Sequence, residues 1–386
     1  MTQAFAERLA ALSGAGRLRT LEALQGAQGS DIELGGEALI NFCSNDYLGL
    51  ANHPRVREAM KRAVDRYGAG SGASALLSGR SLAHVELEAA LAAAVGRERA
   101  LLFSSGYLAN LGVLAALVGR HDRVYHDRLN HALLIDGVKL SGAVHHRYPH
   151  ADTHALAAEL GTAPAAAAKW VVTDGVFSMD GDVAPLPALA AICAQAGATL
   201  ICDDAHGFGV LGAGRGTAAH CGLDASAVPL IVITFGKALG TAGAAIAGPA
   251  DIIEYLVQTA RTFIYDTAPP PAVAAATHEA LALALDDPTL RTRLESNVEY
   301  FRAGLRARGL PLSTSTTPIQ PVLLGSDRRA LAAAASLRAR GLYVRAVRPP
   351  TVPEGTARLR ICLSAAHDTD QIDRLLDGLA ALPEDA

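Results

Sequence analysis

Seven short apolar runs mark the middle of the chain, and each is followed by a polar or glycine-rich turn. Several are too short and too uniformly apolar for strands with one face in water. Their alternation with helical patterns is typical of an open, mostly parallel α/β sheet covered by helices on both faces. The runs are Ala100–Phe103, Arg123–His126, Ala143–Tyr148, Trp170–Thr173, Thr199–Cys202, Leu230–Phe235 and Ala244–Ala247.

The flanking regions have different patterns, which predict a large domain over residues 46–285 between an N-terminal segment (1–45) and a small α+β domain (286–386). The N-terminal segment holds a helix over about 5–24 and a strand near 31–41. The small domain is expected to begin within one long helix and to alternate strands with helices. Further elements are predicted at 54–67, 81–95, 272–308, 312–324, 328–340, 342–347, 359–363 and 367–381.

Charge and composition narrow the classes of function. The chain has 386 residues, half of them apolar, with 34 basic and 38 acidic side chains, so neither a nucleic-acid surface nor an anionic-membrane surface is expected. No apolar run reaches the roughly 18 residues of a membrane span, and Glu7 and Arg8 stand where a signal peptide is apolar. Five scattered cysteines without a CxxC pair predict reduced thiols in a cytoplasmic protein.

Polar residues follow five of the runs. In an open α/β sheet, ligands bind beyond the carboxyl ends of the strands, so these residues are expected to meet at one edge. Any one of them could be a turn residue, but five together favour a site. The segments are Ser104–Tyr107, Asp127–His131, Asp174–Gly181, Asp203–Gly207 and Gly236–Gly240.

Lysine is rare: only Lys61, Lys139, Lys169 and Lys237 occur. Lys237 alone lies between glycines directly after a predicted strand. It is either a functional lysine or a surface turn residue, and its position alone does not decide between the two.

The remaining polar segments permit two kinds of site. Asp203, Asp204 and His206 could bind a metal ion. Alternatively, a strand-end Asp, a strand-end Lys and the Ser104–Gly106 turn at a helix start are the three parts that pyridoxal phosphate needs: a partner for the ring nitrogen, a Schiff-base amine and a phosphate cradle. Three further histidines alternate faces on a strand, so no metal site is predicted there; they are His145, His146 and His150.

Four motifs together resemble the α-oxoamine synthases, which are pyridoxal-phosphate enzymes of the aspartate-aminotransferase fold (fold type I). The resemblance extends from about residue 19 to the last helix. The motifs are Asn41–Leu50, Thr173–Asp182, Asp203–Gly207 and Thr234–Lys237.

The resemblance implies a role for each matching residue around the cofactor. Lys237 would carry pyridoxal 5'-phosphate covalently, Asp203 would pair with the ring nitrogen, His206 would lie by the ring oxygen and His131 would stack on the ring. These four are the predicted catalytic residues. Further contacts are expected from the backbone of Gly106 and Tyr107 near the phosphate, the Thr234 hydroxyl, and Ser178.

The resemblance also implies the substrates. Asn130–Gly137 and Arg348–Pro353 are most similar to members that condense L-alanine with a pimeloyl thioester, on coenzyme A or a carrier protein, in biotin synthesis. Arg360 would hold the amino-acid carboxylate, with Thr351, Arg19 and His131 also contacting substrate. Family members are homodimers, which is the expected assembly here.

One departure from the family affects the phosphate end. Asp266 falls where relatives often have a small hydroxyl residue, and an extra carboxylate near a phosphate is unfavourable. No role is therefore assigned to Asp266 or to Thr267.

Three alternatives remain at this point. A sibling reaction would join glycine or serine to another acyl thioester, as in the condensation of glycine with acetyl-CoA. A metal-dependent hydrolase would use Asp203, Asp204 and His206. A non-catalytic module would bind the cofactor without releasing CO2.

Overall fold

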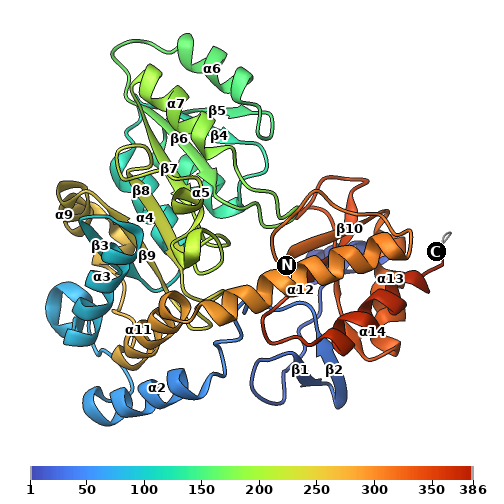
Figure 1. Ribbon diagram of the computed structural model, residues 1–386. Helices are drawn as coiled ribbons and strands as arrows, with labels where there is room; N and C mark the ends of the chain where they lie inside the picture. Colours follow the sequence, from blue (N-terminus) through green and yellow to red (C-terminus); the bar gives the residue numbers. More distant parts are fainter. Residues whose placement is uncertain (1, 384–386) are drawn as a thin grey trace. The chain divides into compact units, whose positions relative to one another are not determined.

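The computed structural model describes residues 2–383, and these divide into two compact units (Figure 1). The first unit holds the N-terminal chain to Gly49, the stretch Met179–Asp182 and the chain from Thr292 onward. The second holds Leu50–Ser178 and Val183–Arg291. Within residues 2–383, no helix is both long and apolar enough to cross a membrane.

The second unit is built on a seven-stranded sheet with the order β3-β9-β8-β7-β6-β4-β5. Neighbouring strands from β8 to β5 are parallel, and β9 is antiparallel to both β8 and β3. Each strand coincides with one of the seven apolar runs, which confirms the predicted mostly parallel α/β sheet. The strands are β3 (Arg99–Phe103), β4 (Arg123–Asp127), β5 (Val144–Tyr148), β6 (Lys169–Asp174), β7 (Ala198–Asp203), β8 (Leu230–Thr234) and β9 (Ala244–Gly248).

Helices connect the strands, and local residue chemistry sets several of their ends. The first full helix of this unit begins at Pro54, whose missing N–H is not needed in a first turn, and ends before Gly68 at positive φ. The helices are α2 (Pro54–Tyr67), α3 (Leu82–Val95), α4 (Gly106–Leu117), α5 (Ala132–Ser141), α6 (Thr153–Gly161), α7 (Leu186–Ala196), α8 (Thr217–His220), α9 (Ala250–Thr259), α10 (Arg261–Ile264) and α11 (Pro271–Asp286).

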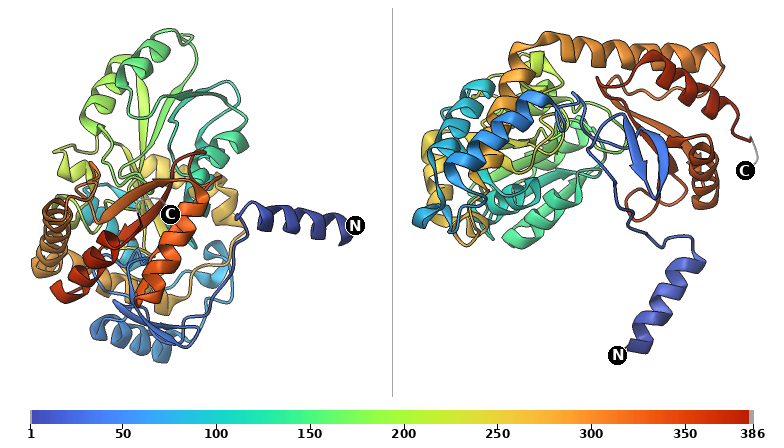
Figure 2. Two further views of the ribbon diagram at one scale, coloured as in Figure 1. Left: turned by 90° about the vertical axis from the view of Figure 1, so that its right-hand side faces the viewer. Right: turned by 90° about the horizontal axis from the view of Figure 1, so that it is seen from below.

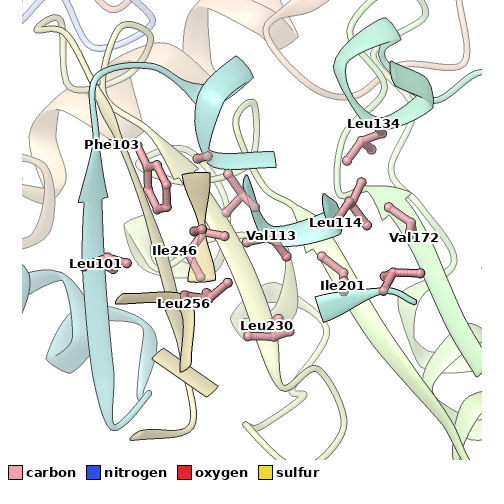
Figure 3. Close-up of a cluster of buried hydrophobic side chains, with 14 of the residues drawn as sticks. Leu101, Phe103, Val113, Leu114, Leu134, Val172, Ile201, Leu230, Ile246 and Leu256 are labelled. Atoms are coloured by element: carbon pink, nitrogen blue, oxygen red, sulfur yellow. The ribbon is translucent and has the colours of Figure 1, made fainter. Parts of the chain in front are cut away.

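The core of this unit lies between the sheet and helices α4, α5 and α9 (Figure 3). Val172 and Ile201 from adjacent strands pack with Val113 and Leu114 of α4. The residues that alternate with them along the strands, such as Val171 and Leu200, are also fully buried. Both faces of the sheet are therefore covered, which explains why its strands are uniformly apolar.

The first unit contains two three-stranded sheets with the orders β1-β2-β11 and β10-β13-β12. Its strands are β1 (Asp31–Leu34), β2 (Glu37–Asn41), β10 (Ile319–Gly325), β11 (Leu342–Tyr343), β12 (Arg345–Val347) and β13 (Ala357–Cys362). Its helices are α1 (Thr2–Gly14), α13 (Asp327–Ala339), α14 (Thr369–Ala380) and, from Thr292 onward, α12 (Pro288–Ala307).

Along β13, residues of the hydrophobic core of the first unit alternate with residues outside that core. Leu359 and Ile361 are fully buried in a cluster that includes Leu337 of α13 and Leu375 of α14. Because side chains alternate between the faces of a strand, the intervening residues of β13 point away from this cluster. Two of those intervening residues are arginines, Arg358 and Arg360.

Five predicted elements were wrong in detail. The strand predicted at 312–324 begins only at Ile319, and the one predicted at 342–347 is divided between β11 and β12, which belong to different sheets. The N-terminal helix ends at Gly14, not near residue 24, and Gly16 adopts a positive φ just after it. The strand predicted at 31–41 is a hairpin, because Gly35 and Gly36 both adopt positive φ and turn the chain between β1 and β2. The long helix predicted at 272–308 is broken before Pro288, because the residue preceding proline disfavours helical backbone.

Helix α1 differs from the other helices of its unit. All its residues from 3 to 14 are exposed, and it extends away from the β1–β2 hairpin of the same unit (Figure 2). Phe5, Leu9 and Leu12 recur at helical spacing and are about half exposed (55%, 54% and 44%). This helix therefore shows an uncovered apolar stripe to solvent.

Candidate active site

The polar strand ends meet at one edge of the seven-stranded sheet because β4, β6, β7 and β8 are parallel. Asp174 at the end of β6 is paired in register with Asp203 at the end of β7. Thr234 ends β8, the next strand. All lie within the second unit.

Asp203 is buried (2% exposed), and both its oxygens have neutral donors. The Ala205 N–H donates to Oδ1 at 2.9 Å, and the Asn110 side-chain amide of α4 donates to Oδ2 at 2.7 Å. These bonds stabilise the charge and orientation of the carboxylate without neutralising it.

Asp204 follows in sequence but has a different environment. Its carboxylate accepts hydrogen bonds from the Thr217 N–H (2.7 Å) and hydroxyl (2.5 Å), so it fixes the loop that precedes α8. Burial raises the pKa of Asp204 to about 7, although the Thr217 donors oppose the shift. The two neighbouring carboxylates are therefore bonded to different elements and do not form a shared pair.

Lys237 lies in a tight turn after β8, and its side chain is half-buried. Its carbonyl accepts from the Gly240 N–H (2.8 Å), and the Thr241 N–H donates to the Phe235 carbonyl (3.0 Å). Gly240 has φ of 64°, and a Cβ there would lie 2.2 Å from the Ala51 nitrogen. The turn is therefore held rigidly and requires glycine at that position.

His131 is the N-cap residue of α5, and hydrogen bonds fix both its backbone and its ring. Its N–H donates to Asp174 Oδ2 (2.8 Å), and its Nδ1 accepts from the Leu133 N–H (3.2 Å), which places the proton of the neutral ring on Nε2. Desolvation lowers the pKa of His131; the Asp203 carboxylate opposes this, and the Lys237 cation lowers it further. The three groups therefore interact electrostatically, and the ring is neutral near pH 7.

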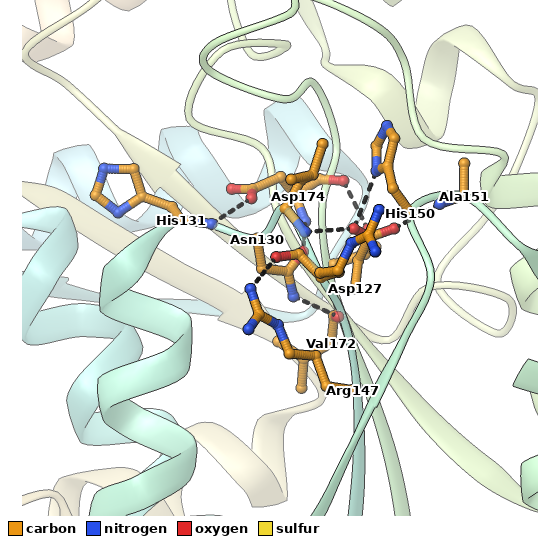
Figure 4. Close-up of polar contacts among 11 residues, drawn as sticks. Asp127, Asn130, His131, Arg147, His150, Ala151, Val172 and Asp174 are labelled. Atoms are coloured by element: carbon orange, nitrogen blue, oxygen red, sulfur yellow. Dashed lines mark hydrogen bonds and ion pairs between the residues drawn. The ribbon is translucent and has the colours of Figure 1, made fainter. Parts of the chain in front are cut away.

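A network of buried polar residues supports the His131 loop (Figure 4). Asn130 donates to the Val172 carbonyl (2.8 Å) and accepts from the Asp174 N–H (3.2 Å). Asp127 accepts from the Leu129 and Ala151 N–H groups, both at 2.7 Å. Burial and the Asp203 carboxylate raise the pKa of Asp174, and its bond from the His131 N–H opposes that shift.

The Ser104–Tyr107 turn opens α4 beside the end of β8. Ser105 is the N-cap and accepts from the Leu108 N–H at 3.2 Å. A Cβ at Gly106 would lie 2.6 Å from the Thr234 hydroxyl, so backbone and hydroxyl are in close approach. The first-turn N–H groups of such a helix bind anions. Tyr107 is 44% exposed, and its hydroxyl donates to Asp136 at 2.8 Å.

The remaining predicted cofactor residues lie in nearby loops. His206 is buried in the turn after β7, where the Gly207 N–H bonds the Asp204 carbonyl. Ser178 is half-buried in the loop after β6. Asp266 accepts a hydrogen bond from the Ser104 hydroxyl, whereas Thr267 is exposed and forms a β-bridge with Ser74.

Of the four predicted substrate residues, Arg360, Arg19 and Thr351 lie in the first unit and His131 lies in the second. Arg360 of β13 is half-buried and donates to Asn45 Oδ1 at 3.1 Å. Arg19 and Thr351 are both exposed, and the Arg19 guanidinium donates to the Thr351 hydroxyl at 3.2 Å. Arg19 and Thr351, two predicted substrate contacts far apart in the sequence, therefore lie side by side.

Three residues at these sites were missed from sequence. Asn110 contacts Asp203, Asp174 contacts His131, and Asn45 contacts Arg360. Asp174 and Asn45 lie inside quoted motifs, and Asn110 is one helical turn after Gly106. Their roles depend on contacts between distant segments, which residue type alone does not reveal.

No group of three or more His, Cys, Asp or Glu side chains is arranged to hold a metal ion anywhere in residues 2–383. The hydrolase alternative also requires Asp203 and Asp204 to act together, yet their partners are Asn110 on one side and Thr217 on the other. The geometry therefore does not support that alternative.

Comparisons with known proteins show the family to which the chain belongs. A family profile described as aminotransferase class I and II matches residues 37–379. The chain is 55% identical over 383 residues to an 8-amino-7-oxononanoate synthase of Methylococcus capsulatus, covering 99% of each chain, and 53% identical over 375 residues to one of Pseudomonas aeruginosa, covering 97% and 93%.

Solved structures give the same grouping. A serine palmitoyltransferase from S. paucimobilis with bound PLP and myriocin superposes with a TM-score of 0.93 at 31% identity, covering 98% of this chain and 96% of that one. An 8-amino-7-oxononanoate synthase from Francisella tularensis superposes with a TM-score of 0.77 at 32% identity, covering 89% and 97%.

Proposed function

Because the chain belongs to the aminotransferase class I and II family and, within it, to the α-oxoamine synthases, we propose that it condenses L-alanine with a pimeloyl thioester. The products are 8-amino-7-oxononanoate, CO2 and the free thiol. The observation that carries this proposal is that a buried, neutrally bonded Asp203 ends β7 while Lys237 follows the end of the adjacent parallel strand β8.

The residues at the sheet edge fit pyridoxal phosphate, the cofactor of this family. The Asp203 carboxylate suits a protonated ring nitrogen, because its donors leave it negative. At Gly106 the missing side chain leaves the first-turn N–H groups of α4 accessible beside the Thr234 hydroxyl, which suits a phosphate. When bound, this cofactor supplies a conjugated ring that withdraws electrons from the α-carbon of an amino acid.

Lys237 is proposed to hold the cofactor through Nζ and to move the substrate proton. Once the amino group of L-alanine has replaced Nζ, the freed neutral amine of Lys237 would take the α-proton, which leaves an electron pair to attack the thioester carbonyl as the thiol departs. After CO2 is lost, a proton returns to the same carbon. The turn between β8 and Gly240 fixes the backbone from which the Lys237 side chain extends.

The other residues bind and orient. The neutral His131 ring is proposed to stack on the cofactor, with His206 at the ring oxygen and Ser178 lining the pocket. Arg360 is proposed to bind the alanine carboxylate. Its guanidinium donates to the Asn45 amide oxygen and to the Cys362 sulfur, and these contacts orient it on β13. Arg19 and Thr351 are proposed to contact the thioester substrate.

Assembly and location are part of the same proposal. A homodimer is supported by the apolar stripe of α1, which a second copy would cover. A cytoplasmic location is supported by the cysteines, all five of which are free thiols.

The test is a substrate panel on the holoenzyme. L-alanine, glycine and serine are each combined with pimeloyl-CoA, pimeloyl carrier protein and acetyl-CoA, and CO2 release and condensation product are quantified. We expect kcat/KM for alanine with a pimeloyl thioester to exceed every other pairing by on the order of 100-fold. A preference for glycine with acetyl-CoA would instead assign the sibling reaction. Cofactor binding without CO2 release would identify a non-catalytic module.

A further inference from the structure

We infer that Asn110 is a positioning residue that joins the two anchoring points of the cofactor: the carboxylate of Asp203 and the first turn of α4. The inference rests on the proposed function for the identity of the cofactor, but not for the choice of substrates. It assigns Asn110 no contact with the cofactor, because the residue acts through Asp203 and Gly106.

The geometry of Asn110 is that of a buried bridge. Its side chain is 1% exposed in the second turn of α4. Nδ2 donates to Asp203 Oδ2 at 2.7 Å and to the Gly106 carbonyl at 3.0 Å. An amide nitrogen carries two protons, so both bonds form at once. One side chain therefore connects the end of β7 to the start of α4.

The chemistry of the bridge preserves the charge of Asp203. With Oδ2 bound by Asn110 and Oδ1 by the Ala205 N–H, the carboxylate cannot rotate. Each oxygen still has a lone pair available for a ring N–H. A lysine or arginine in place of Asn110 would neutralise Asp203 and compete with a protonated ring nitrogen. A neutral donor avoids that competition.

The other end of the bridge fixes the turn proposed to hold phosphate. Gly106 faces Thr234, whose hydroxyl leaves no room for a Cβ, and its carbonyl is held by Asn110. A shift of Asn110 therefore moves the ring-nitrogen partner and the phosphate turn together. Neither Asp203 nor Gly106 alone links the two in this way.

The remaining atom of the amide indicates that its donors are what the site requires. Asn110 Oδ1 is buried and has no hydrogen-bond partner within residues 2–383. An unpaired buried acceptor is unfavourable, and an apolar side chain would remove that penalty but leave Asp203 Oδ2 without its donor. The two hydrogen bonds donated by Nδ2 thus explain why an amide side chain, and not an apolar one, occupies position 110.

The test measures cofactor binding and its pH dependence on purified Asn110→Ala and Asn110→Asp. For Asn110→Ala we expect the Kd for pyridoxal phosphate, from titration of apoenzyme, to rise about tenfold. We also expect kcat to fall about 10- to 100-fold, with KM for L-alanine within about twofold.

Asn110→Asp provides the sharper readout, because it keeps the size of the side chain but titrates. Near pH 6 a proton shared with Asp203 preserves one bond, whereas near pH 8.5 two carboxylates repel. We therefore expect the Kd of Asn110→Asp for pyridoxal phosphate to rise between pH 6 and pH 8.5, by a factor about tenfold larger than for wild type. If Asn110→Ala is too unstable to purify, this variant carries the test alone.

Val113→Ala is the matched control, since Val113 is fully buried on the same helix and packs in the apolar core. Val113→Ala should lower the midpoint temperature of thermal unfolding without changing the Kd for pyridoxal phosphate or the pH dependence of that Kd. The inference is overturned if both Asn110 variants lose only stability and bind cofactor like wild type. If wild type itself binds no pyridoxal phosphate, the proposed function fails as well. A change of preferred amino acid leaves the inference intact.

Discussion

The buried carboxylate Asp203 in the second unit and the two arginines of β13 in the first unit have different kinds of hydrogen-bond partner. At the edge of the seven-stranded sheet, the negatively charged Asp203 carboxylate accepts hydrogen bonds from two neutral donors, the Asn110 amide and the Ala205 N–H. On β13 the charge is positive, and its two arginines differ. Arg358 is buried (4% exposed) and paired with Asp180, whereas Arg360 is bonded to the neutral Asn45.

The difference separates charges that stabilise the fold from charges that remain for a ligand. A guanidinium paired with a carboxylate inside its own unit is already neutralised. A charged group whose partners are neutral is oriented but keeps its charge. We therefore expect that Asp203 and Arg360 bind ligands and that Arg358 stabilises the fold. Substitutions at these positions should separate the two kinds of charge, and loss of Lys237 should have the largest effect.

Lys237→Ala should abolish the near-visible absorbance of the bound cofactor and lower kcat by roughly 10⁴-fold, because no other side chain at this edge supplies the amine. Absorbance spectra and single-turnover assays measure both. Lys169→Ala is the control. Lys169 is the first residue of β6, and its Nζ donates to the Ala196 carbonyl. Retention of the absorbance in Lys237→Ala would assign the cofactor to another lysine.

Asp203→Asn should lower kcat by on the order of 10³-fold while the absorbance of bound cofactor persists, because the ring nitrogen loses its anionic partner. Stopped-flow measurement of α-proton exchange in deuterated L-alanine isolates the affected step. Full exchange at the wild-type rate would show that the charge of Asp203 is not what the site uses.

Arg360→Gln and Arg358→Gln compare the two arginines of β13 directly. The first should raise KM for L-alanine roughly 30-fold with little change in stability, because a charge-assisted contact to the carboxylate is lost. The second should lower the free energy of unfolding by about 2 kcal/mol and leave KM unchanged, because the charge-assisted bond between Arg358 and the partly exposed Asp180 is lost. Equal KM changes in both variants would remove the distinction drawn here.

Asp204→Asn should change how stability depends on pH. With its pKa raised to about 7 from the usual 3.8, folded Asp204 retains a proton that the unfolded chain has lost, so its contribution declines as pH rises through that window. We expect the variant to gain about 1 kcal/mol per pH unit relative to wild type between pH 5 and 7, measured by urea unfolding. The exposed Asp65→Asn should show no such slope.

Arg19→Ala should have the smallest effect. Its bond to Thr351 is exposed and 3.2 Å long, and exposed contacts of this kind are worth about 0.2–1 kcal/mol. We expect KM for the thioester to rise about two- to fivefold, with kcat unchanged. A larger effect would indicate that Arg19 binds the substrate through a buried contact.

Much of the fold could be predicted because strand positions depend on local patterns. All seven apolar runs became strands, and α2 begins and ends where Pro54 and Gly68 predict. The N-terminal helix was predicted too long because its composition continues past Gly14 while its backbone does not. The hairpin at Gly35–Gly36 was missed because two glycines in an apolar-edged segment can also lie in a strand.

The candidate site could be predicted only in part. Lys237 is identifiable because lysine is rare and this one follows a strand. Asn110 and Asp203 are 93 positions apart, and nothing in the local sequence of α4 predicts that its amide points at β7. Such pairings depend on sheet order, which becomes known only when the strands are assembled.

The close approach of Gly106 to Thr234 has an evolutionary consequence. Because a methyl group at 106 would overlap the Thr234 hydroxyl, position 106 can gain a side chain only after position 234 has lost its hydroxyl. A larger residue at position 106 therefore requires two substitutions in a fixed order. Thr234→Gly must come first to make space, and Gly106→Ala can follow. The two positions are thereby expected to evolve as a linked pair.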